Sequence, residues 1–290
     1  MERKADSTFT HSDAGGLIRL QARLTDPLAW AGPAWATLCG VVSSGNFGWQ
    51  GEDWLRLALL ILLVDGGWGT LWAALKSTDW ATPLRRWRSW RSGEAVTPPP
   101  YTLPNSPGDR AYRWLGQLRS WWRNVLWPAC GPALSALAVA LPVMVILAIS
   151  LGPELMLLSA AALAVMQLSL AWEGCSFALA ILFPWLAGRV AFGPLTPASA
   201  GLALAFALAW GGGRRSESPW GRWLGVGGQL AASALLVVLR HPLATGYLLL
   251  MLIPQLALLP WLQRGQTTSW YVRYTQPWLM AAMLVAAWAL

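Results

Sequence analysis

A single carboxylate, Asp79, stands among arginines at the point where a long apolar run ends. The run closes in AALKSTDWATPLRRW, so Arg85 and Arg86 follow the acid closely, and Arg88 comes next. Carboxylate oxygens are ligands that Mg²⁺ prefers, but one carboxylate does not build a magnesium site. Asp79 is therefore either a surface charge or the remnant of a metal site. The rest of the sequence must show whether other metal ligands accompany it.

The composition is typical of a membrane protein. Of 290 residues, 56% are hydrophobic and only 12% are charged, and the mean hydropathy is +0.44. An ordinary soluble domain carries about twice this share of charged residues. The chain is therefore expected to cross a bilayer several times.

Nine stretches are long and apolar enough to be spans, each of which needs about 17–25 residues. They cover residues 28–48, 55–75, 128–151, 154–172, 175–193, 197–212, 224–241, 244–262 and 275–290. A spanning backbone must satisfy its own hydrogen bonds, and no alternating strand pattern is present, so these stretches are expected to be helices. The predicted fold is all-α: a cytoplasmic tail over 1–27, then a membrane domain of nine helices over 28–290, with a long cytoplasmic loop over 78–122.

The basic residues predict the orientation in the membrane. With the N-terminus in the cytoplasm, 18 of the 21 Lys and Arg residues fall on the inner side, and Arg56, Arg189 and Arg240 fall on the outer side. The positive-inside rule then places the N-terminus in the cytoplasm and, after nine spans, the C-terminus outside. Because this asymmetry explains the net charge of +8, no nucleic-acid partner is expected.

Tryptophan and cysteine are explained by the membrane setting. Many of the 22 tryptophans lie near the expected membrane interfaces, as in an aromatic belt; stacking surfaces for a large flat ligand are the alternative. Cys39, Cys130 and Cys175 lie far apart and form no C-x-x-C motif. Core packing, and neither a zinc site nor a disulfide framework, is expected for them.

The long loop over 78–122 has three parts. WATPLRRWRSWRSG is basic and aromatic, EAVTPPPYTLPNSPGD is too rich in proline for a helix, and RAYRWLGQLRSWWRNVLW has helical periodicity. The last part places Arg113, Leu115, Leu118 and Trp122 for an amphipathic helix on the inner leaflet. A shorter inner connection, WGGGRRSESPWGRW, joins the sixth and seventh expected spans.

These inner loops, four spans apart, belong to a wider resemblance. The runs that carry it are DPLAWAGPAWATLCGVVSSG, FPWLAGRVAFGPLTP, IPQLALLPWLQR and SWYVRYTQPWLMAAMLVAAWAL, and it extends over nearly the whole chain. The sequence resembles the UbiA superfamily of intramembrane prenyltransferases, and within it the chlorophyll and bacteriochlorophyll synthases, which attach an isoprenoid alcohol to a chlorophyllide propionate. The resemblance implies a nine-helix UbiA-type bundle in an inner membrane, cytoplasmic or photosynthetic.

The resemblance also implies a damaged metal site. In the family, the loop after the second span carries N-D-x-x-D-x-x-x-D and the loop after the sixth span carries a second aspartate motif, and together they hold a prenyl diphosphate through Mg²⁺. On this chain the first motif keeps Asp79, while Thr78, Thr82 and Arg86 replace its asparagine and its other two aspartates. The second motif keeps only Glu217. A degenerate paralogue is implied.

Arginines gather where the acids are missing. Under the resemblance, two groups face each other across a cytoplasmic mouth: Arg85, Arg86, Arg88 and Arg91 in the first loop, and Arg214, Arg215 and Arg222 in the second. Such a mouth attracts phospholipid headgroups, a pigment propionate or an acidic protein surface without a metal. Topology determination with lipid contact is the alternative explanation.

Two further residues have alternative roles. Asp65, in the middle of the second expected span beside Gly66 and Gly67, is either a protonated or hydrogen-bonded structural acid or a polar contact to a ligand in the helical cavity. His241, at the outer end of the seventh expected span, is either a solvated loop histidine or a ligand of a chlorophyll magnesium.

The expected function is non-catalytic. The resemblance and the missing acids imply an accessory or assembly subunit of a photosynthetic membrane complex that binds (bacterio)chlorophyll, an isoprenoid or lipid, with membrane lipid and complex proteins as partners. The alternative is a divergent but active prenyltransferase that esterifies a chlorophyllide or related acceptor, with arginines and one Mg²⁺ held by Asp79 and Glu217 orienting the diphosphate.

Overall fold

The computed structural model describes residues 32–91, 99–171, 177–264 and 267–290. These residues form helices joined by turns and short loops, and no β-strand occurs among them. The all-helical class predicted from the sequence is therefore confirmed for this part of the chain. The expected tail over 1–27, the start of the first span and Cys175 lie outside the described residues.

The helical segments have the following bounds: α1 (Pro33–Ser43), α2 (Gly51–Ile61), η2 (Leu62–Trp68), α3 (Gly69–Ser77), α4 (Ala81–Ser89), α5 (Pro107–Trp121), η3 (Trp122–Leu126), α6 (Trp127–Leu151), α7 (Pro153–Ala171), η5 (Ala178–Leu182), α8 (Phe183–Phe192), α9 (Pro197–Arg214), α10 (Pro219–Val238), α11 (Pro242–Gln263) and α12 (Thr268–Trp288). The η segments are π-helical and continue directly into the α-helices beside them.

Within the part of the chain that the structure describes, four helices are long and apolar enough to cross a membrane by length and composition: Gly51–Ser77, Pro107–Leu151, Pro219–Val238 and Pro242–Leu262. Pro33–Ser43, Pro153–Ser169 and Ala178–Phe192 are shorter apolar helices. Each of the nine expected spans contains a helix in its described part, but α1 covers only 11 residues of the first span. A bundle of nine spanning helices is therefore not confirmed, and length and composition support four spans among the described residues. α12 is less apolar because Arg273, Thr275 and Gln276 lie in its first half.

A serine or threonine followed by proline starts α5, α9 and α10. The hydroxyl groups of Ser106, Thr196 and Ser218 accept hydrogen bonds from the backbone N–H three residues further on, at 3.2, 3.3 and 2.9 Å. The proline that follows each of them lacks an N–H, which the first helical turn does not need. Two of these dipeptides fix where α9 and α10 begin, and both of these helices line the candidate site.

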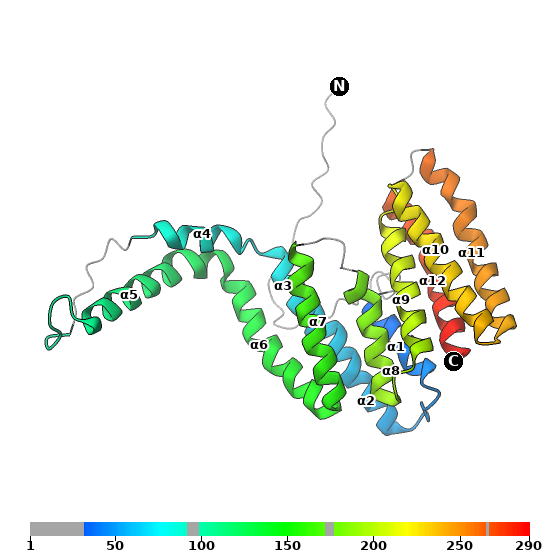
Figure 1. The fold of residues 1–290 in the computed structure, drawn as a ribbon, viewed down its shortest axis with the longest axis horizontal. Coiled ribbons are helices and arrows are strands. Elements are labelled where there is room, and N and C mark those ends of the chain that lie inside the picture. Colours follow the sequence, from blue (N-terminus) through cyan, green and yellow to red (C-terminus); the bar gives the residue numbers. More distant parts are fainter. Residues whose placement is uncertain (1–31, 92–98, 172–176, 265–266) are drawn as a thin grey trace.

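The helices pack around a central pair, α1 and α8. Figure 1 shows α9 to α12 on one side of this pair, and α2, α3, α6 and α7 on the other. Each side has its own cluster of buried apolar residues, and both clusters include residues of α1 and α8. Trp185 of α8 lies at the centre: its Nε1 donates to Ser199 Oγ at 3.0 Å, and its ring stacks on Phe206 with centroids 5.9 Å apart.

Glycines allow the closest helix crossings. A methyl group added at Gly40 of α1 or at Gly188 of α8 would overlap a backbone carbonyl of the facing helix, and one at Gly228 of α10 would overlap a carbonyl of α9. Small residues at helix interfaces are typical of helices packed in a membrane, where close backbone approach replaces hydrophobic burial as the main attraction.

An arm made of α4, α5 and η3 projects from the bundle (Figure 1). α5 continues through η3 into α6 as one helix of 45 residues, and this helix bends at the π-helical segment. α4 packs beside the bend, where Trp121 Nε1 donates to the carbonyl oxygen of Pro83 at 3.2 Å and the Trp121 ring lies 5.2 Å from that of Trp87. The helix predicted for the last part of the long loop is confirmed.

The apolar side of α5 is only partly covered. Trp114 and Leu115 are each 53% exposed and Trp122 is 45% exposed, whereas helical periodicity places Arg113 on the other side of α5. Such a distribution is typical of a helix that lies in a membrane interface.

Candidate functional site

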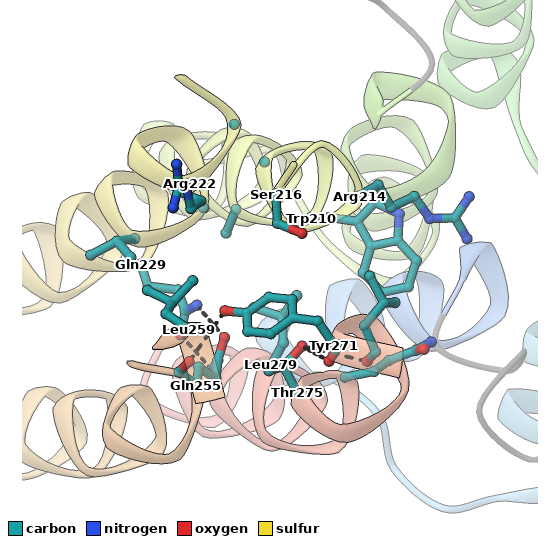
Figure 2. Close-up of a pocket in the computed structure, with 18 of the residues that line it drawn as sticks. Trp210, Arg214, Ser216, Arg222, Gln229, Gln255, Leu259, Tyr271, Thr275 and Leu279 are labelled. Carbon is teal, nitrogen blue, oxygen red and sulfur yellow. Dashed lines mark hydrogen bonds between the residues drawn. The ribbon is translucent and has the colours of Figure 1, made fainter. Parts of the chain in front are cut away.

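A polar cavity of about 40 Å³ lies between α9, α10, α11 and α12 (Figure 2). It is at the end of the bundle that carries the α9–α10 turn, and the positive-inside rule predicts that this end faces the cytoplasm. This volume accommodates about two or three water molecules, or one small anionic group of similar size.

One wall of the cavity is a pair of glutamine side chains. Gln229 Nε2 donates to Gln255 Oε1 at 2.8 Å, and Gln255 Nε2 donates to Gln229 Oε1 at 3.0 Å. The Tyr271 hydroxyl donates to the backbone oxygen of Gln255 at 3.2 Å, which adds α12 to this wall. Polar side chains inside apolar helices are costly unless they pair with one another, and this reciprocal pair meets that requirement.

The opposite wall carries a hydroxyl group without a partner. Ser216, in the α9–α10 turn, is 2% exposed, and within the described residues its Oγ makes no hydrogen bond. Figure 2 shows this hydroxyl directed across the cavity toward the Tyr271 ring. A buried hydroxyl that is left unpaired costs about 1–3 kcal/mol, so Ser216 Oγ is available to bond a polar group that enters the cavity.

Two arginines reach this end of the bundle in different ways. Arg222 of α10 and Arg214 of α9 both line the cavity. The Arg214 guanidinium lies over the Trp210 ring, 5.1 Å from its centroid, and Figure 2 shows it directed away from Ser216. Arg215 does not line the cavity, and its carbonyl oxygen accepts from Ser218 Oγ at 3.0 Å. Arg222 is therefore the arginine best placed to meet a group bound beside Ser216.

Asp79 caps a helix. Its Oδ1 accepts hydrogen bonds from the backbone N–H groups of Ala81 and Thr82, each at 3.1 Å, at the start of α4. Hydrogen bonds from Thr82, with a smaller contribution from the charge of Arg85, hold the pKa of Asp79 below its usual value of 3.8. The ionised carboxylate accepts these hydrogen bonds from the first N–H groups of α4 and so stabilises the start of the helix.

Glu217, the other acid of the expected diphosphate site, also has a local partner. Its Oε1 accepts from Thr268 Oγ1 at 2.6 Å, which links the α9–α10 turn to the first turn of α12. Glu217 is exposed and Thr268 is half-buried. Glu217 thus connects the α9–α10 turn to α12 at the surface of the bundle and does not line the polar cavity.

The residues present do not fit the Mg²⁺ site that the resemblance implies. Mg²⁺ that holds a diphosphate needs several converging oxygen ligands. Asp79 and Glu217 lie in separate turns with partners of their own, and among the described residues no three His, Cys, Asp or Glu side chains lie close enough to hold a metal ion.

The two groups of arginines are not brought together. Arg85, Arg86 and Arg88 are exposed on α4, and a guanidinium nitrogen of Arg85 donates to Thr82 Oγ1 at 3.4 Å. Figure 1 shows α4 on the arm, with α3 and α7 between it and the α9–α10 turn. The expected mouth with arginines on both sides is therefore replaced by two separate basic surfaces.

Asp65 and His241 lie outside the polar cavity. Asp65 is 2% exposed in the π-helical segment η2, which places it inside the bundle as its position in the apolar run predicted. His241 is exposed and directly precedes Pro242 at the start of α11, where it lines a second cavity at the other end of the bundle. The alternatives stated above for both residues stay predictions.

Five residues that shape the cavity were not among those predicted from the sequence: Ser216, Gln229, Gln255, Tyr271 and Thr275. The signal that would have found the glutamines is their position inside apolar runs, where a polar side chain usually marks a buried partner or a functional site. Ser216 gives no such signal, because serine is ordinary in a turn.

Comparisons of the chain with models of protein families, with curated proteins and with solved structures found no match. The likeness to the prenyltransferases therefore rests on sequence runs such as DPLAWAGPAWATLCGVVSSG.

Proposed function

We propose that the chain is a non-catalytic binding protein with a UbiA-type bundle of nine membrane helices, which serves as an accessory or assembly subunit of a photosynthetic membrane complex. Its N-terminus is cytoplasmic and its C-terminus lies outside. The observation that carries the proposal is the polar cavity, which Arg222 and Ser216, with its unpartnered hydroxyl, both line at the predicted inner end of the bundle.

The cavity chemistry favours an anionic end group. Arg222 supplies a permanent positive charge with several N–H donors, and Ser216 supplies a hydroxyl that is free to donate. Leu252, Leu259 and Leu279 line the same cavity and offer apolar contacts beside these donors. A prenyl phosphate, a pigment propionate or a phospholipid headgroup fits this combination, because each joins an anion to an apolar body.

The placement of the acids supports binding without turnover. In a metal-dependent prenyltransferase, Mg²⁺ neutralises the leaving diphosphate. Here Asp79 is used to cap α4 and Glu217 is bonded to Thr268, so neither acid is free to converge on a diphosphate at the polar cavity. The chain holds an anion with arginine and leaves it intact.

The arm supports a docking role. α5 exposes Trp114, Leu115 and Trp122 on its apolar side, and α4 exposes Arg85, Arg86 and Arg88. Indole rings and basic residues together favour the surface of an anionic inner leaflet. In this proposal the arm lies on that leaflet, and the bundle contacts proteins of the complex within the membrane.

Binding is tested with geranylgeranyl diphosphate and with bacteriochlorophyllide as separate probes, on protein in nanodiscs of phosphatidylcholine. We expect at least one probe to bind, and Arg222→Gln to weaken that binding about tenfold, because a hydrogen bond to a charged group contributes about 1.5–3 kcal/mol. Arg273→Gln, which changes an exposed arginine of α12, is the matched control and should bind as the unchanged protein does. Failure of both probes to bind, or equal binding by Arg222→Gln, would overturn the assignment of this cavity.

The accessory role is tested by purification from the native membrane in a mild detergent. We expect photosynthetic proteins and pigment to remain with the chain. A protein that migrates alone and free of pigment would contradict this role, even where the binding experiment succeeds.

A further inference from the structure

A second cavity, of about 590 Å³, lies at the opposite end of the bundle from the polar cavity. It is formed by the α10–α11 turn, the first turns of α11 and the last turns of α12. Its volume lies within the range of about 300–1,000 Å³ that is typical of small-molecule sites. No part of the proposed function uses this cavity.

The lining of this cavity is divided in its chemistry. Arg240, His241 and the hydroxyl-bearing Tyr247 supply polar groups on the α10–α11 turn and on α11. Leu243 and Trp288 supply apolar surface, and they are 81% and 80% exposed. A ligand that fits must carry an anionic group at one end and an apolar body at the other.

The backbone at Arg240 is in a conformation that seldom accommodates arginine. Its φ is +65°, in the left-handed region, and the N–H of Arg240 donates to the carbonyl of Val237 while that of His241 donates to the carbonyl of Leu236, both at 2.9 Å. Helices that end in this way usually carry glycine at this position. An arginine held in an unfavourable conformation at the edge of a cavity indicates that its side chain is needed there.

The exposed apolar side of the cavity indicates which kind of amphiphile it binds. Leu243 and Trp288 face the surroundings of the helices, and those surroundings are acyl chains if the bundle spans a membrane as its apolar helices indicate. Tyrosine and tryptophan are enriched at the level of lipid headgroups, and both are present here. Membrane lipids are also the amphiphiles present at the highest local concentration.

We propose that this cavity binds one anionic phospholipid of the outer leaflet. The phosphate pairs with the Arg240 guanidinium and with His241, and one acyl chain lies along Leu243 and Trp288. This site is independent of the polar cavity at the inner end, so either can fail without the other.

The test uses protein reconstituted in nanodiscs with equal amounts of phosphatidylglycerol and phosphatidylcholine, followed by native mass spectrometry of the protein and the lipid it retains. We expect the unchanged protein to retain one phosphatidylglycerol in preference to phosphatidylcholine. Arg240→Asn should lower this retention about fivefold or more, while Arg273→Asn should leave it unchanged. Asparagine tolerates the left-handed region, so the helix end is kept in the Arg240 variant.

Two further variants separate ligand binding from a structural role of Arg240. Arg240→Gly relieves the backbone and should unfold at an equal or higher temperature, yet it should lose the lipid as Arg240→Asn does. Ala289→Trp places an indole in the cavity and should lower retention with Arg240 intact. The proposal is overturned if the Arg240 variants retain phosphatidylglycerol normally, if phosphatidylcholine is retained equally well, or if a pigment bound through His241 is found in place of lipid.

Discussion

Gln229 and Gln255 bind one another through two amide hydrogen bonds, of 2.8 and 3.0 Å, and so join α10 to α11 beside the polar cavity. The pair is buried, with the two residues 5% and 6% exposed. Each side-chain amide is the main hydrogen-bond partner of the other, because apolar surroundings offer few alternatives. Changing the pair therefore tests how α10 and α11 are held together at this end of the bundle.

Replacing one member of the pair should cost more than replacing both. Gln229→Leu leaves the Gln255 amide without its main partner, and we expect it to lower the free energy of unfolding by about 1–2 kcal/mol. Gln229→Leu with Gln255→Leu should cost less than the two single changes added together, because no amide is then left unpaired. A double-mutant cycle of unfolding in detergent measures this, and strictly additive effects would contradict the pairing.

The glycine contact between α1 and α8 should not tolerate a methyl group. Gly188→Ala brings a carbon into the backbone of α1, so the helices must separate, and we expect a loss of about 1–3 kcal/mol or more. Gly227→Ala is the matched control: nothing lies near its added methyl group, and alanine should stabilise α10 by about 0.5–1 kcal/mol. Equal thermal stability of the two variants would show that α1 and α8 do not touch as described.

Asp79 should behave as a helix cap. Asn and Asp are similarly good at this position and Ala is poor, so Asp79→Asn should keep α4 ordered while Asp79→Ala should loosen it. Hydrogen exchange of the backbone amides of Ala81, Thr82 and Leu84, measured by mass spectrometry, should speed up in the alanine variant only. Equal exchange in the two variants would remove the capping role.

The start of α5 should loosen in acid. Asp109 accepts from the Asn105 N–H at 2.9 Å and pairs with Arg113 at 2.8 Å, and these two contacts hold the pKa of Asp109 below its usual value of 3.8. A carboxylate with a lowered pKa stabilises the folded state at pH values above 3.8, and this stabilisation is lost as the pH falls through the lowered pKa. A spin label at position 112 should therefore become more mobile below about pH 3.8.

The control for the acid experiment is Asp109→Asn, in which the label should already be mobile at neutral pH and should change little in acid. A label that becomes more mobile as the pH rises from acid to neutral would contradict the stabilising role of the ionised Asp109 carboxylate.

The arm should lie in the membrane interface. A spin label at Leu115, on the exposed apolar side of α5, should be more accessible to oxygen, which concentrates among acyl chains, than to a water-soluble nickel complex. A label at Arg113 should show the reverse, because helical periodicity places Arg113 on the other side of α5. Two labels with the same high accessibility to the nickel complex would show that the arm stands in water.

The helices themselves could largely be predicted from the sequence. Long apolar runs predict them, and the Ser-Pro and Thr-Pro dipeptides at Ser106, Thr196 and Ser218 mark where three of them begin. The number of spans could not be fixed in the same way, because α12 carries Arg273 and Gln276 and so is only moderately apolar.

The candidate site was harder to predict than the fold. The density of arginines and the loss of aspartates indicated an anion-binding surface at the inner loops, but sequence alone did not show that α4 lies on a projecting arm. That arrangement follows from the bend at η3, and π-helical segments have no reliable sequence signature. The structure also gives Asp79 a role that needs no second acid: its carboxylate caps the start of α4.

The most direct test of the account is a turnover assay. Purified protein is incubated with labelled geranylgeranyl diphosphate, bacteriochlorophyllide and Mg²⁺, beside an active bacteriochlorophyll synthase prepared in the same detergent. We expect no esterified pigment above background from this protein while the synthase control forms product. Product formation that is abolished by Asp79→Asn would contradict it, and would show that Asp79 serves a metal site as well as the start of α4.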